Sequence, residues 1–158
     1  MSSTETTSME AKSLMVMMSD GLNRQCSLLQ TLFRLAESQG RLIESSEHDS
    51  LLSLVHERQA IMEQLVGIRS DLIEKAEELR ARSEFLSDQE RESLQLQIDE
   101  TRELSRKVLA IDTQDVDRLI ENRSSCQEKL AGITHTMNAR RGYQSSQQSS
   151  PRYADAQG

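Results

Sequence analysis

Aromatic residues are scarce in this sequence of 158 residues, which contains two Phe, two Tyr and no Trp. Only 35% of the residues are hydrophobic, and Pro occurs once. A compact domain of this length normally buries more large side chains, which argues against a single thick core. The remaining residues are rich in Leu, Glu, Gln, Arg, Ser and Ala. This composition is typical of long helices that pack through narrow seams.

An excess of basic residues is also missing. The net charge of the chain is −7, which argues against binding of a nucleic-acid backbone as its main task. The Arg residues are scattered among Glu residues, as is typical of the solvated faces of helices. We therefore expect no nucleic-acid partner.

Paired cysteines and long apolar runs are absent from the sequence. Cys26 and Cys126 lie far apart and form no CxxC pair, so we expect two reduced thiols. No apolar stretch approaches the roughly 20 residues that a membrane span needs. The short run Leu14–Met18 follows an acidic and polar start, which is a poor match to a signal peptide. These features predict a cytoplasmic protein without stable membrane insertion.

No set of residues in the sequence has the spacing of a catalytic or metal site. The segment His56–Ala60 begins like a zinc-binding HExxH motif, but Ala60 replaces the second histidine. Asp112, Asp115 and Asp117 lack the Gly and the terminal Glu of a calcium-binding loop, and helix capping explains them better. We therefore expect no enzyme, no catalytic residue, no metal and no cofactor.

Apolar residues recur at steps of three and four along most of the chain, which predicts three helices at about 10–44, 50–82 and 88–138. Arg58 interrupts the apolar stripe of the second helix once. Ser87 and Glu90 form a capping box at the start of the third. Residues 1–9 are polar and expected to be disordered, and the segment 112–115 is expected to kink or restart the third helix.

Short connections between long helices predict an all-α fold, an elongated antiparallel bundle of three helices with coiled-coil-like packing. The third helix is the longest, so its C-terminal part should extend beyond the other two. An apolar stripe on that part would be exposed and would need a partner.

The last residues, 139–158, are predicted to form a flexible tail rich in Ser and Gln. Seven consecutive Ser and Gln residues, Gln144–Ser150, bury almost nothing that could offset about 1–2 kcal/mol of backbone entropy per residue. The tail nevertheless holds both tyrosines, Tyr143 and Tyr153. Tyr offers a large contact area with a polar tip, so both are candidate anchors for a partner. A solubilising spacer with incidental tyrosines is the alternative interpretation.

Four segments have distinctive patterns: Leu28–Glu44 is rich in Leu, Leu51–Ile68 contains an Arg-Gln step, Val108–Arg123 contains an acidic step, and the tail contains tyrosines. Together they resemble the FlgN family of flagellar export chaperones. The resemblance covers roughly residues 20–158.

The resemblance implies a cytoplasmic chaperone for hook-associated (filament junction) proteins of the FlgK-like and FlgL-like kind. Such a chaperone binds the assembly-prone helical end of its client, keeps the client soluble and delivers it to the flagellar export apparatus. An amphipathic helix can cover an apolar client helix by helix-in-groove packing. The candidate partner-binding residues are Leu119, Ile120, Leu130, Ile133, Met137, Tyr143 and Tyr153. Ordinary bundle core is an equal alternative for the first two.

Two other classes of protein fit the same pattern. A non-enzymatic coiled-coil adaptor or structural protein would self-associate through its exposed stripes, whereas a chaperone would be a monomer or a weak homo-oligomer. A surface-binding amphipathic protein is a third hypothesis, but the seams are narrow and no Arg residues flank an aromatic-rich face.

Overall fold

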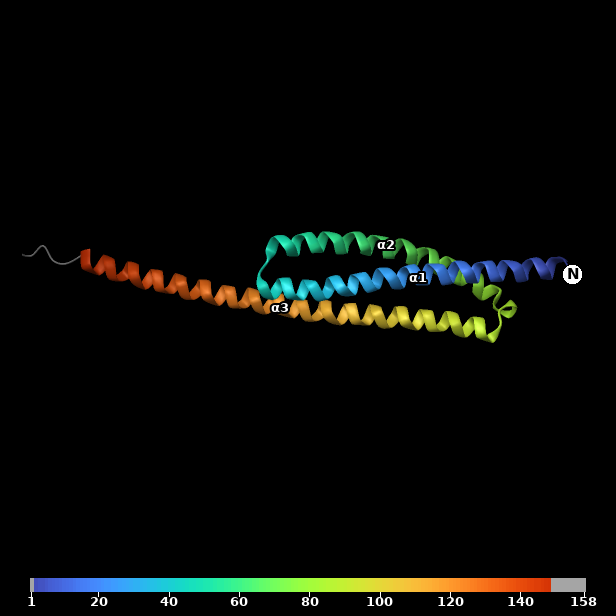
Figure 1. Cartoon of the computed structure of the whole chain (residues 1–158). Helices are drawn as coiled ribbons and strands as arrows, with labels where there is room; N and C mark the ends of the chain where they lie inside the picture. Colours follow the sequence, from blue (N-terminus) through green and yellow to red (C-terminus); the bar gives the residue numbers. More distant parts are fainter. Residues whose placement is uncertain (1, 149–158) are drawn as a thin grey trace, which may run out of the picture. The chain divides into compact units, whose positions relative to one another are not determined.

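The computed structural model describes residues 2–148, and they form three long helices and one short 3-10 turn. The elements are α1 (Ser2–Ser45), α2 (His48–Ala81), η1 (Ser83–Phe85) and α3 (Asp88–Gln148), as Figure 1 shows. No strand occurs among the described residues. The prediction of an all-α helical fold is confirmed.

The chain divides into two compact units, residues 1–116 and residues 117–158. We call the described part of the first, residues 2–116, the bundle unit, and that of the second, residues 117–148, the C-terminal segment. The bundle unit contains α1, α2, η1 and the beginning of α3, and the C-terminal segment continues α3.

In the bundle unit the three helices run up, down and up, as the sequence predicted (Figure 1). Two apolar clusters join all three. The first contains Ala11, Met18, Leu22, Leu72, Leu79, Leu86 and Leu94, and the second contains Leu29, Leu32, Ile61 and Val108. Burial of one such Leu or Val side chain is worth about 1.5–3 kcal/mol, so these clusters are the main stabilising contribution.

Both connections are short and are fixed by local hydrogen bonds. Ser46 has a positive φ of 58°, and the amide of Glu47 donates to the carbonyl of Leu42 at 3.2 Å, which closes the end of α1. At the start of α3, the Ser87 amide donates to Glu90 Oε2 at 2.8 Å and the Glu90 amide to Ser87 Oγ at 3.1 Å. The predicted capping box is confirmed.

Two helix boundaries differ from the predicted ones. The first helix begins at Ser2 instead of about residue 10, because no Gly or Pro precedes Gly21, and the hydroxyls of Thr6 and Thr7 bond to carbonyls one turn back. The third helix ends at Gln148 instead of about residue 138, since the only proline lies further on, at position 151. Residues 139–148, predicted to be tail, are therefore helical, and the rest of that tail lies outside the described residues.

The predicted kink at residues 112–115 is also absent from the structure, because α3 is continuous through these residues. The hydroxyl of Thr113 bonds to the carbonyl of Leu109 at 2.9 Å, and Asp112 and Asp115 bond to other helices instead of capping their own.

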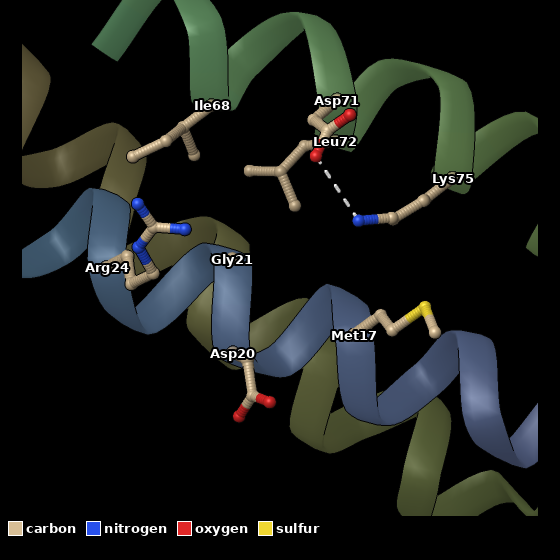
Figure 2. Close-up of a pocket in the computed structure, with 8 residues that line it drawn as sticks. All are labelled: Met17, Asp20, Gly21, Arg24, Ile68, Asp71, Leu72 and Lys75. Carbon is tan, nitrogen blue, oxygen red and sulfur yellow. Dashed lines mark hydrogen bonds and ion pairs between the residues drawn. The ribbon is translucent and has the colours of Figure 1, made fainter. Parts of the chain in front are cut away.

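Gly21 lets α1 and α2 approach each other closely. A Cβ atom at this position would lie 2.7 Å from Leu72 Cδ2, whereas a Cβ at Gly67 would meet nothing within 4 Å. Figure 2 shows the side chain of Leu72 above Gly21 in a hollow that is also lined by Lys75 and Asp71, which form an ion pair. Gly21 is therefore a packing residue of the contact between α1 and α2.

These two glycines give a matched pair of substitutions. Gly67→Ala is expected to raise the free energy of unfolding by about 0.5–1 kcal/mol, since Ala loses less backbone entropy in a helix. Gly21→Ala has the same favourable effect on backbone entropy, but its Cβ crowds Leu72, which costs about 1–3 kcal/mol. The free energy of unfolding of Gly21→Ala should therefore be lower than that of Gly67→Ala. Urea unfolding followed by circular dichroism measures both. Equal gains at the two positions would show that the contact at Gly21 is unimportant.

Candidate partner-binding surface

Arg58 lies inside the bundle unit, although it is charged, and is only 9% exposed. Its guanidinium makes two parallel bonds to Asp112, from Nη1 to Oδ1 and from Nη2 to Oδ2, both at 2.7 Å. Nη1 also donates to Gln39 Oε1 at 2.6 Å. A bidentate pair of this kind is the strong form of the Arg–carboxylate interaction. The residue that interrupts the stripe of α2 therefore has its partners on α1 and α3.

Asp115 belongs to the same polar cluster as Arg58, Asp112 and Gln39, which we call the polar layer. Its Oδ2 accepts a bond of 3.1 Å from Gln39 Nε2, and the residue is only 2% exposed. Asp112 and Asp115 are on α3, Gln39 is on α1 and Arg58 is on α2, so the layer joins all three helices. Charges that are buried and satisfied in this way favour one register over its alternatives, because any slip leaves them unpaired.

Removal of the Arg58 guanidinium should destabilise the bundle unit. Arg58→Met is expected to lower the free energy of unfolding by about 2–3 kcal/mol, since Asp112 and Gln39 lose their donor while partly buried. Arg58→Lys should lower it less, because an ammonium keeps the charge but not the parallel bonds. Chemical denaturation measures each variant.

The matched control is Arg69→Met on the same helix. Arg69 is exposed and makes no ion pair among the described residues, so its loss should change stability by less than about 0.5 kcal/mol. An Arg58→Met variant as stable as this control would contradict the role of the polar layer.

The face of α3 that packs in the bundle unit has a period of seven residues. Its buried residues are Leu94, Thr101, Val108 and Asp115. Such a heptad repeat confirms the coiled-coil-like packing expected from the sequence. The next positions of the same series are Asn122, Lys129 and Thr136, which are polar and exposed. The face that packs in the bundle unit thus has no apolar continuation after Asp115.

A different set of residues gives the C-terminal segment an apolar face. Every described side chain from Leu119 to Gln144 is exposed. The predicted partner-binding residues among them are large and apolar, with exposed fractions of 46% for Leu119, 58% for Ile120, 62% for Leu130, 56% for Ile133, 51% for Met137 and 75% for Tyr143. Tyr153 lies outside the described residues.

These residues follow a heptad repeat of their own. Alternating steps of four and three connect Leu119, Arg123, Cys126, Leu130, Ile133, Met137 and Arg140, which we call the apolar row. Ile120 and Tyr143 flank it. The steps place the row along one face of the helix, the pattern of one strand of a coiled coil. The sequence analysis treated these positions as a continuation of the stripe of the bundle. In sequence, the row is instead shifted by one residue from the heptad series of Leu94, Thr101, Val108 and Asp115.

The middle of the apolar row contains a shallow hollow. It has a volume of about 420 Å³ and is lined by Lys129, Gly132, Ile133, Thr136 and Met137. Gly132 has no side chain to fill it, and a Cβ there would meet nothing within 4 Å. A side chain of a partner helix could enter this hollow, as a knob enters a hole in a coiled coil.

The bundle unit has a groove that the sequence analysis did not find. It has a volume of about 330 Å³ and lies among the three helices, with Leu29, Leu32, Met62, Leu65, Val66, Val108 and Leu109 in its lining. Met62, Val66 and Leu109 remain 48%, 69% and 66% exposed. The signal in the sequence was the adjacent apolar pairs of α2, such as Ile61–Met62 and Leu65–Val66, which make its apolar face wider than one neighbouring helix can cover.

Other kinds of site were sought in the same part of the chain. Residues 2–148 contain no group of three or more His, Cys, Asp or Glu side chains placed to hold a metal ion. None of the described helices has an apolar stretch that could cross a membrane. Both cysteines are free thiols, and Cys126 is exposed. Comparison with models of protein families, with curated proteins and with solved structures gave no match to this chain.

Proposed function

We propose that this protein is a cytoplasmic chaperone of flagellar type III export, without enzymatic activity. It binds the assembly-prone helical end of a hook-associated protein, keeps that client soluble and delivers it to the export apparatus. The observation that carries the proposal is the apolar row, whose large side chains are about half exposed or more along one face of the C-terminal segment. The resemblance of four segments to FlgN-type chaperones supports the choice of hook-associated proteins as the class of client.

The chemistry of the row fits an intermittently occupied binding surface. Monomeric proteins seldom expose several large apolar side chains along one face of a helix, since their burial would be favourable by about 1.5–3 kcal/mol per side chain. A subunit that polymerises through terminal helices exposes an apolar helix face of the same kind before assembly. Packing of the two faces against each other covers both until the client is exported.

Replacement of large apolar side chains of the row by Ser tests this proposal. The triple variant Leu130→Ser, Ile133→Ser, Met137→Ser is expected to bind a FlgK-like or FlgL-like subunit at least about a hundredfold more weakly, since three apolar contacts are lost. Isothermal titration calorimetry with the full-length chain and the purified subunit measures this.

The control removes equally exposed apolar residues elsewhere. Val16 and Leu96 are 59% and 65% exposed in the bundle unit, and the double variant to Ser should bind the client as tightly as the unaltered chain. Circular dichroism should show the same helicity in both variants. Equal client binding by the row variant and its control would rule out the apolar row as the binding surface. A stable homo-oligomer that dissociates in the row variant would favour the self-associating adaptor instead.

A further inference from the structure

Four of the five basic residues of the C-terminal segment lie on or beside the apolar row, and the fifth, Arg118, precedes it. Arg123 and Arg140 are members of the row, and Lys129 and Arg141 occupy the positions that flank it in a heptad repeat. None of the four has an acidic residue three or four positions away in the sequence, so none can form an ion pair along its own helix. None of these four cations forms an ion pair with another described side chain.

The acids of the same segment lie on the opposite face. Asp117, Glu121 and Glu128 are each two positions from a member of the row, which is about 200° around the helix. The face that carries the row is thus apolar and basic, and its back is acidic. The bundle unit has the opposite balance, since residues 1–116 carry 13 basic and 22 acidic side chains.

The bundle unit shows how this chain accommodates an arginine within an apolar stripe. Arg58 interrupts the stripe of α2, and a carboxylate of the facing helix, Asp112, binds it with two bonds of 2.7 Å. Arg123 interrupts the apolar row in the same way. When a partner helix covers the row, the guanidinium loses water, and only a carboxylate opposite it can offset that cost.

We infer that the partner of the apolar row is an amphipathic helix of acidic character. It carries apolar residues at its own heptad positions, a carboxylate opposite Arg123, and further Asp or Glu residues along the edges that face Lys129 and Arg141. This inference rests on the proposed function and adds the chemistry by which the binding surface selects its client.

A second copy of the row does not satisfy this requirement. The charged residues that a second row and its flanks would bring to the contact are all basic, since the three acidic residues of the segment lie on the opposite face of the helix. Like charges across a coiled-coil interface are unfavourable in either orientation of the two helices. A lipid surface fits less well too, because a row with heptad spacing is narrow and the face has no Trp or Phe.

Two synthetic peptides of about four heptads provide the test. Both have Ile and Leu at the core positions with one residue opposite Arg123 left polar. The acidic peptide carries Glu at that position and at both flanks, and the basic peptide carries Lys at the same places. The full-length chain should bind the acidic peptide at least tenfold more tightly in fluorescence anisotropy. The difference should shrink as the salt concentration rises.

Charge reversal in the protein completes the design. The triple variant Arg123→Glu, Lys129→Glu, Arg141→Glu should prefer the basic peptide, a rescue that loss of structure cannot produce. The control, Lys12→Glu, Arg80→Glu, Lys107→Glu, reverses three exposed cations of the bundle unit and should keep the preference for the acidic peptide.

The outcomes separate this inference from the proposed function. Equal binding of both peptides, or a reversed variant that still prefers the acidic one, overturns the inference even if a hook-associated subunit binds. A stable homodimer that needs the row, or binding to anionic vesicles that exceeds binding to the acidic peptide, overturns it as well. If the acidic peptide is preferred but no hook-associated subunit binds, the partner chemistry holds and the proposed function fails.

Discussion

The bidentate pair of Arg58 with Asp112 is the interaction on which the arrangement of this protein depends. The leucines of the two apolar clusters would tolerate several registers, since apolar contacts have little directionality. Arg58, which is only 9% exposed, tolerates one register, because its guanidinium needs the carboxylate of Asp112 and the amide of Gln39 at fixed places. Gln39 and Asp115 extend the same requirement to α1 and to the buried position that follows Val108 in the heptad series of α3.

Asp115 also ends the series of buried positions that repeats every seven residues along α3. Up to this residue, the buried face of α3 repeats every seven residues, and beyond it the same face is polar. The apolar residues of the C-terminal segment follow another face, which does not continue the packing series of the bundle unit. A single continuous apolar stripe is the pattern of one long coiled coil. Here the apolar row is shifted by one residue in sequence from the series that packs in the bundle unit, so the two form separate apolar surfaces.

The sequence predicted the all-α class, the up-down-up order and the capping box at Ser87, because these depend on local spacing and on short connections. It also identified Leu119, Leu130 and Ile133 as members of an apolar stripe. The role of Asp112 and Asp115 could not be predicted, since helix capping and interhelical bonding require the same residue type. Only the facing positions of Arg58 and Gln39 decide between them. The helix ends at Ser2 and Gln148 were missed because polar composition was interpreted as disorder, although neither segment contains Pro.

Cys126 occupies a core position of the apolar row and is exposed. Its thiol thus sits where any helix that covers the row must lie, while the other cysteine, Cys26, is on α1 in the bundle unit. The row therefore contains an intrinsic chemical reporter, because alkylation of a thiolate requires access for the reagent. Protection of this one sulfur from modification, followed over time in cells, would reveal when the surface is occupied and when it is vacated, without any label added to the protein.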